Sequence, residues 1–215
     1  MLNLRRRQKG VTLIELMIAL ALFGLLTALA APNFMGWIQN QQIRAGAESI
    51  LNGIQLARRT AVNNNTWARF NLCNTTFPSV ATWQVLVASS AAATPDAADT
   101  FGLCGAGLAI STGNEVRVQE HSYMEGAKNA QVTTSSIVPT LPITIPITND
   151  SSTSVMFNGL GQLIANDAAV GGNPIRVIEV STANGRPLLV TVQQGGSVKM
   201  CDPSPLLAAT DPRHC

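Results

Sequence analysis

The strongest hydrophobic pattern of the chain lies near its N-terminus, where a long apolar run follows a short basic segment. Residues 1–10 contain Arg5, Arg6, Arg7 and Lys9, and residues 11–31 are almost entirely apolar. A run of about 20 apolar residues is long enough to cross a bilayer as a helix. Because basic flanks stay in the cytoplasm, the pattern predicts one membrane-spanning helix at 11–31, with the rest of the chain outside the cytoplasm.

A second helical pattern continues after this run. Apolar residues recur at steps of four and three, while polar residues take the other faces, which is typical of an amphipathic helix packed on a globular domain. Residues 32–65 are therefore predicted to continue the helix, with the asparagines at 63–65 ending it. Pro32 predicts a kink, or else marks the end of the membrane-spanning part. The apolar stripe consists of Ile43, Ala47, Ile50, Ile54, Ala57 and Ala61.

The remainder of the chain, residues 66–215, shows short alternating stretches separated by turn residues. This pattern predicts about eight short antiparallel strands, and thus an α+β fold in which a long N-terminal helix packs on an antiparallel sheet or sandwich. Prolines at 139, 142 and 146 restrict 132–147 to edge or extended segments. Residues 89–113 are predicted to form a surface loop, and 75–153 carries no motif. The expected strands lie within 67–72, 83–88, 116–118, 132–147, 155–163, 175–180, 188–192 and 198–201.

The charge of the chain is concentrated in its first ten residues. The formal net charge is +2, from 14 basic and 12 acidic residues. Without the four basic residues before Gly10, 10 basic residues face 12 acidic ones, a net charge of −2. The general positive charge that favours nucleic-acid binding is therefore absent from the main domain.

The four cysteines are Cys73, Cys104, Cys201 and Cys215. An even number in an exported domain indicates two disulfides, and three connectivities are possible. The pairs Cys73–Cys104 and Cys201–Cys215 are favoured because they close the shorter loops. The alternative of free or metal-binding thiols lacks the CxxC spacing of a zinc site, so no metal or cofactor is expected.

Glu15 is the most informative single residue. It is the only ionisable side chain between Lys9 and Arg44, and it lies inside the apolar run. An acid within a membrane segment costs about 2.5–3.5 kcal/mol, so it normally marks a function or a partner. Cleavage after Gly10 would give Val11 a free amine about 6 Å of helix rise from Glu15. In a bundle of helices, this carboxylate could neutralise the amine of a neighbour and fix the register of packing.

Two alternatives explain the apolar run without such a cut. One is a conventional secretory signal peptide cleaved near 28–31, where small residues gather, although its apolar core would be shorter. The other is a plain signal anchor, which leaves Glu15 unexplained.

The segment Lys9 to Leu16, Lys-Gly-Val-Thr-Leu-Ile-Glu-Leu, resembles the leader junction of type IV pilins and type II secretion pseudopilins. The resemblance implies that residues 1–10 form a leader, that a prepilin peptidase cuts after Gly10 and methylates Val11, and that Glu15 acts in assembly. Pro32 also matches this family, and the resemblance implies that it too acts in assembly. Major pilins usually begin with Phe, so Val11 favours a minor subunit.

The same resemblance implies a cellular route. The chain would first be a single-pass inner-membrane protein in contact with lipid, with its C-terminal domain in the periplasm. It would then join other major and minor pilins through the inner-membrane assembly platform. The end point would be a cell-surface pilus or a periplasmic pseudopilus.

The C-terminal part narrows the resemblance. A Phe157-x-x-x-Gly161 turn, a hairpin ending in 198–203 and the closing Cys215 are similar to the GspH/FimT/FimU family of minor pilins and pseudopilins. This implies a subunit that assembles into, primes or caps a type IV pilus for adhesion, twitching motility or DNA uptake. A GspH-type pseudopilin of type II secretion is the alternative.

A further alternative is a DNA-binding subunit at the pilus tip for natural transformation. Some FimT-like members carry a basic Gly-Arg-x-Arg stretch in the last hairpin, where this chain has Gly196-Ser197-Val198-Lys199. The candidate DNA contacts are therefore Arg186, Lys199 and Arg213, although phosphate binding needs several cations acting together.

Catalytic chemistry is not indicated. The only histidines are His121 and His214, and neither belongs to a recognisable nucleophile–base set. The glycine-rich stretches at 102–107 and 159–161 lack the βαβ context of a nucleotide-binding loop. The sequence therefore predicts a structural protein rather than an enzyme.

Overall fold

The computed structural model describes most of the helix and of the strands predicted above. The described residues are 10–73, 82–90, 114–121, 126–127, 129–137, 147, 154–164, 173–204, 206–207 and 210–215, without the side chains of 29–33 and 73. The chain divides into two compact units, Met1–Ile38 and Gln39–Cys215. The predicted loop at 89–113 and the proline-containing segment at 138–146 lie almost wholly outside the described residues.

The helix α1 extends over Leu13–Asn64 and is assigned without interruption through Pro32. Its last turn closes with two backbone hydrogen bonds, from the amide of Thr66 to the carbonyl of Ala61 at 3.1 Å and from the amide of Asn65 to that of Val62 at 3.2 Å. Asn65 has a φ of 49°. This left-handed residue and its two bonds form the Schellman motif that ends many helices, so the asparagines stop the helix where the sequence predicted.

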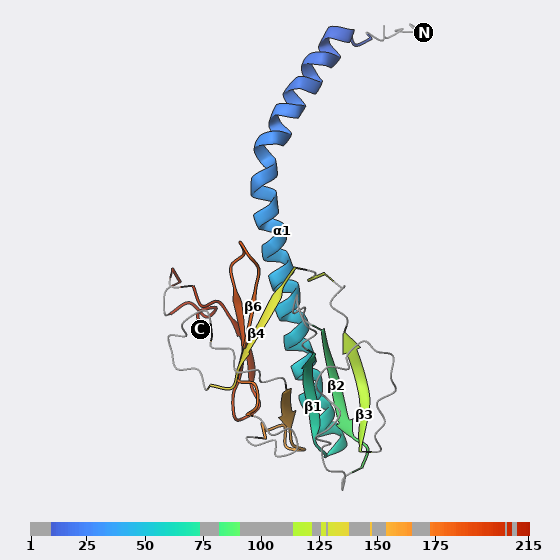
Figure 1. Cartoon of the computed structure of the whole chain (residues 1–215), viewed down its shortest axis with the longest axis vertical. Coiled ribbons are helices and arrows are strands. Elements are labelled where there is room, and N and C mark those ends of the chain that lie inside the picture. The colour runs from blue at the N-terminus through green and yellow to red at the C-terminus, as the bar shows by residue number, and fades with distance from the viewer. Residues whose placement is uncertain are drawn as a thin grey trace, which may run out of the picture. The chain divides into compact units, whose positions relative to one another are not determined.

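Eight described strands form two antiparallel sheets, one with strand order β3-β2-β1-β5 and the other with order β4-β6-β7-β8. Both sheets lie along the C-terminal half of α1 (Figure 1). The predicted α+β fold is confirmed, because each of these strands overlaps one of the stretches expected from the alternation. The bounds are β1 Ala68–Cys73, β2 Thr82–Ala88, β3 Glu115–His121, β4 Gln131–Ser135, β5 Ser154–Phe157, β6 Val177–Ser181, β7 Leu188–Val192 and β8 Val198–Cys201.

The core fills the space between α1 and the two sheets. All six residues of the predicted stripe, from Ile43 to Ala61, are completely buried. The first sheet packs Phe70 and Trp83 against the helix, and a Cβ added to Gly53 would stand 2.8 and 2.9 Å from these rings. A glycine therefore lets the aromatic rings lie directly on the helix backbone, at a cost in helix propensity of about 1 kcal/mol.

Two turns join the sheets near the C-terminal end of α1. The amide of Leu163 donates to the carbonyl of Gln194 at 3.1 Å, and the Gln194 side-chain amide donates back to the Leu163 carbonyl at 3.2 Å. Arg58 of α1 donates from Nε to the carbonyl oxygen of Gly161 at 3.0 Å. Gly161 and Gly196 both have positive φ, and a Cβ at Gly196 would stand only 1.8 Å from the same carbonyl oxygen. The two turns are therefore in direct contact through a position that only glycine fits.

The opposite face of the first sheet carries a buried ion pair. Arg69 of β1 and Glu115 of β3 meet at 2.7 Å between Nη2 and Oε1, with side chains 0% and 1% exposed. Alternation along β1 predicted Ala68, Phe70 and Leu72 on one side, and all three are buried in the core. The polar residues of β1 lie on the other face of the strand. Burial of that face was not predictable, because polar residues alternating with apolar ones are typical of a strand with one solvated face.

Candidate functional site

The leader junction is exposed and precedes the first helical residue. Gly10, Val11 and Thr12 lie outside α1, and the Val11 side chain is 70% exposed. A Cβ added to Gly10 would meet no atom of the described residues within 4 Å. Packing against the described part of the chain therefore does not demand glycine at position 10.

Glu15 stands in the first turn of the helix. Its amide donates to the Oγ1 of Thr12 at 3.4 Å, and the amide of Leu16 donates to the Thr12 carbonyl at 3.2 Å. Thr12 is thus the N-cap, and Thr12-x-x-Glu15 has the spacing of a capping box. This cap was not predicted, although the Thr-x-x-Glu spacing that signals it is present in the sequence. An acid here also interacts favourably with the positive end of the helix dipole.

The carboxylate of Glu15 has no side-chain partner among the described residues, and it is solvent-exposed in the isolated chain. The apolar side chains around it are exposed too. Leu13, Leu16 and Leu20 are 76%, 56% and 62% exposed, and consecutive apolar residues place such side chains on every face of the helix. An amphipathic helix would show one apolar stripe, so this surface requires cover on all sides. Among the helices in the described part of the chain, none is long and apolar enough to be assigned as a membrane span.

An aromatic pair follows Pro32 on the same helix. The rings of Phe34 and Trp37 stack with centroids 5.5 Å apart, and both side chains are more than half exposed. Pro32 itself lies in α1, and its side chain is outside the described part of the structure. Its predicted role in assembly therefore stays a prediction.

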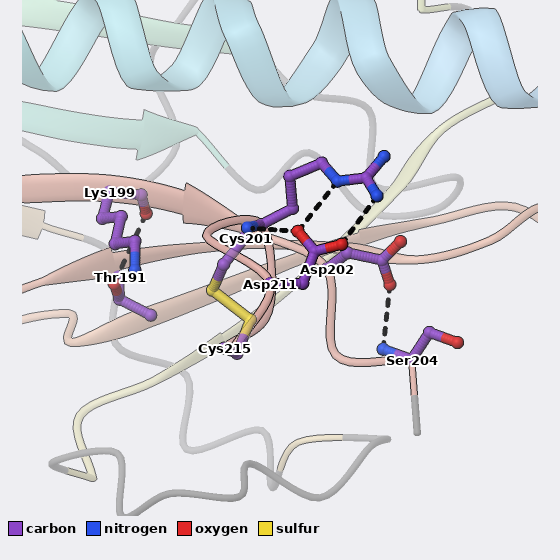
Figure 2. The surroundings of a disulfide bond; sticks show 8 residues. Thr191, Lys199, Cys201, Asp202, Ser204, Asp211 and Cys215 are labelled. Carbon is purple, nitrogen blue, oxygen red and sulfur yellow. Dashed lines mark hydrogen bonds and ion pairs between the residues drawn. A yellow bond between two sulfur atoms is a disulfide. The ribbon is translucent and has the colours of Figure 1, made fainter. Parts of the chain in front are cut away.

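The C-terminal loop is closed by the disulfide Cys201–Cys215, whose Cα atoms are 5.1 Å apart (Figure 2). This pair was predicted and is confirmed. The second predicted pair involves Cys104, which lies outside the described residues. Within the closed loop, the amide of Asp202 donates to the Arg213 carbonyl at 2.6 Å and the amide of Cys215 donates to the Asp202 carbonyl at 3.2 Å.

The basic residues proposed as DNA contacts occupy different elements. Arg186 follows β6, and its amide donates to the Asn40 side chain at 2.9 Å. Lys199 is an exposed residue of β8, opposite Thr191 of β7. Arg213 belongs to the closed loop. Among the described residues, no hydrogen bond or ion pair joins these three side chains, and their grouping in one basic patch stays a prediction.

Arg213 forms an ion pair with an acidic residue of its own loop, Asp211. Its Nε and Nη2 atoms donate to the two carboxylate oxygens of Asp211 at 3.0 and 2.7 Å. The side-chain hydrogen bond from Arg213 lowers the pKa of Asp211 from 3.8 to about 2, and the same bond raises the pKa of Arg213. A phosphate group would have to compete with this two-point ion pair for the guanidinium.

Neither histidine belongs to a metal site in the described part of the chain, where no group of three or more metal-binding side chains occurs. His121 of β3 stacks on Trp83 with ring centroids 5.3 Å apart. His214 lies beside the closing cysteine in the C-terminal loop, and its backbone forms an isolated bridge with Asp202.

Comparisons with known proteins agree with the processing motif. Residues 5–31 match the family model described as the prokaryotic N-terminal methylation motif. No curated protein matches the sequence. These 27 residues include the leader junction, Glu15 and the apolar run.

Two solved structures are similar, both crystal structures of the type IV minor pilin FimU of Pseudomonas aeruginosa. The first, in space group P21, is 12% identical, covers 75% of this chain and 90% of that chain, and has a TM-score of 0.44. The second, in space group P65, is 10% identical, covers 74% and 93%, and has a TM-score of 0.43. These values are too low to carry an argument about function. The chain therefore carries the prokaryotic N-terminal methylation motif at residues 5–31, at the start of a long helix whose C-terminal half packs on antiparallel sheets.

Proposed function

We propose that this protein is a minor pilin that assembles into a type IV pilus and primes or caps the filament. Cleavage after Gly10 releases the leader and leaves Val11 as the methylated N-terminus. The observation that carries the proposal is Glu15, a lone carboxylate in the first turn of a helix whose apolar side chains are exposed on every face.

In a filament, neighbouring helices cover this apolar surface. A carboxylate moved into such a low-dielectric bundle costs several kcal/mol unless a cation pairs with it. The amine of a processed Val11 in a neighbouring subunit supplies that cation, since no basic side chain lies between Lys9 and Arg44. Before assembly, the same surface lies in the inner membrane, with the Gln39–Cys215 unit in the periplasm.

The test replaces Glu15 with Val in cells that make the filaments. The variant should be processed and found in the membrane fraction, yet be strongly depleted from filaments sheared off the cell surface. Asp211→Val is the control, because Asp211 is an acid of the C-terminal loop that pairs with Arg213 at 2.7 Å and lies outside α1. Glu15→Val protein present in sheared filaments at the wild-type level would contradict the proposal.

Deletion of the gene, together with DNA binding by the purified protein, separates the alternatives for the cellular role. A type II secretion pseudopilin would leave surface pili and twitching unchanged when deleted, and would reduce protein secretion instead. A DNA-binding tip subunit would reduce DNA uptake, and its purified form would bind DNA with a steep dependence on salt.

A further inference from the structure

A groove runs between α1 and the end strand of the first sheet. Its volume is about 550 Å³. One wall is a face of α1 that extends from Ala45 to Arg59, and the other is formed by Trp83, Gln119 and His121. All of these residues belong to the Gln39–Cys215 unit, so the groove lies within one compact body.

A β-bulge determines which side chains of β3 line the groove. The register between β2 and β3 shifts between Val85 and Leu86. As a result, Val116 stands opposite Val87, Gln119 opposite Val85 and His121 opposite Trp83. Those three residues of β2 face α1 in the core. The extra residue in β3 therefore turns Gln119 and His121 toward the helix, which is the re-aiming that bulges commonly perform near binding sites.

The dimensions of the groove favour an extended polypeptide. The wall from Ala45 to Arg59 covers 14 residue steps of helix, which is about 21 Å at 1.5 Å per residue. An extended chain advances about 3.4 Å per residue, so about six residues fit along this length. The length is nearly that of β3, the seven-residue strand beside it.

The ends of the groove differ in chemistry. The indole nitrogen of Trp83 donates to the Oγ of Ser49 at 2.9 Å, and the His121 ring stacks on the Trp83 ring. This aromatic pair therefore lies at the end of the groove that is near Ser49. The amide of Ala88, at the other end of β2, donates to the carbonyl of Trp67 just after α1 ends. That second end of the sheet therefore lies toward Arg59.

Arg59 is an exposed cation, and its one hydrogen bond in the described structure runs to Gln55 at 3.2 Å. It has no acidic partner among the described residues. Glu48, the acid that lines the groove, is already engaged with Arg44. On the strand side, Val116 stands opposite Val87, on the face of the sheet toward α1, and is 48% exposed. The surface thus matches a segment with an acidic side chain near Arg59 and an apolar side chain beside Val116.

We propose that the α1–β3 groove binds an extended, acidic segment of a neighbouring pilin-type subunit. The inference rests on the proposed function, because a filament holds subunits side by side at a high effective concentration. It adds a contact between globular units to the contact between N-terminal helices, and it assigns Arg59 as the residue that recognises the acid.

The experiment uses the full-length protein in cells that make filaments. A photo-crosslinking amino acid, p-benzoylphenylalanine, replaces Gln119, an exposed residue that lines the groove. The matched control carries it at Lys199, an exposed residue on the end strand of the other sheet. The Gln119 adduct should be a polypeptide with the same N-terminal methylation motif, linked through a peptide that contains an acidic residue. Arg59→Glu should lower its yield about tenfold, whereas Arg59→Lys should largely retain it.

An adduct at Gln119 that is no more abundant than the Lys199 control, or that is unchanged by Arg59→Glu, would overturn the inference. Its failure is distinguishable from that of the proposed function. Protein found in sheared filaments without a Gln119 adduct refutes only the groove, whereas protein absent from the filaments refutes the minor-pilin role itself.

Discussion

Gly196 is a residue at which the addition of a single methyl group should lower the stability of the fold strongly. It lies in the β7–β8 turn with a φ of 81°, and an added Cβ would stand 1.8 Å from the carbonyl oxygen of Gly161. The contacted atom belongs to backbone, so it cannot rotate away as a side chain would. Gly196→Ala must therefore separate the turn after β5 from the turn between β7 and β8.

The cost follows from what this separation breaks. The left-handed conformation costs an L-residue about 1 kcal/mol. Loss of the two hydrogen bonds between Leu163 and Gln194 costs about 1 kcal/mol each. We therefore expect the free energy of unfolding to fall by about 3 kcal/mol. For a unit of this size, such a loss lowers the melting temperature by about 6–12 °C.

Gly195 provides a matched control in the same turn. A Cβ at Gly195 would meet nothing within 4 Å, and this residue has no positive φ. Gly195→Ala should change stability by less than about 0.5 kcal/mol. Thermal unfolding of the full-length protein in detergent, followed by circular dichroism, compares the two variants, and hydrogen exchange at the Leu163 amide reports the turn contact. Equal melting temperatures for the two variants would refute the reasoning.

Three other predictions concern the disulfide and the two ion pairs. Cys201→Ser should cost about 3 kcal/mol, the amount expected for a closed loop of about 15 residues, and an unchanged melting temperature would contradict it. Arg69→Leu should lower the free energy of unfolding by about 3–5 kcal/mol, because it leaves the Glu115 charge buried without a partner. The double variant Arg69→Leu with Glu115→Leu should recover most of that loss. Equal destabilisation of the single and double variants in denaturant unfolding would count against the ion pair. Because the pKa of Asp211 is lowered in the folded state, its ion pair with Arg213 stabilises the fold above pH 3.8, and this stabilisation is lost as the pH falls through about 2. An NMR titration of Asp211 with a midpoint near 4 would argue against the hydrogen bond.

Much of the fold follows from short-range patterns in the sequence. The apolar stripe from Ile43 to Ala61 has helical spacing, and this spacing can be recognised within a short stretch of sequence. The asparagines at its end and the glycines in the last hairpin mark turns through local backbone preferences. For the same reason the bounds of β7 and β8 agree with the predicted stretches.

The features that were missed depend on residues far apart in the chain. The order of strands in the two sheets comes from long-range pairing, which alternation does not encode. The bulge opposite Val85 and Leu86 changes the face of His121, so its contact with Trp83 was not predictable from its sequence neighbours. Arg69 and Glu115 are separated by 46 positions and read as members of a solvated face.

The central claim is that the chain is processed at Gly10 and used from Val11 onward, with Glu15 facing the new amine of a neighbour. Intact-mass and N-terminal peptide mass spectrometry of the protein purified from its own cells tests this most directly. We expect a polypeptide that begins at Val11 and carries one methyl group on its α-amine. A mature chain that retains Arg5–Arg7, or one that begins near Ala31, would contradict it.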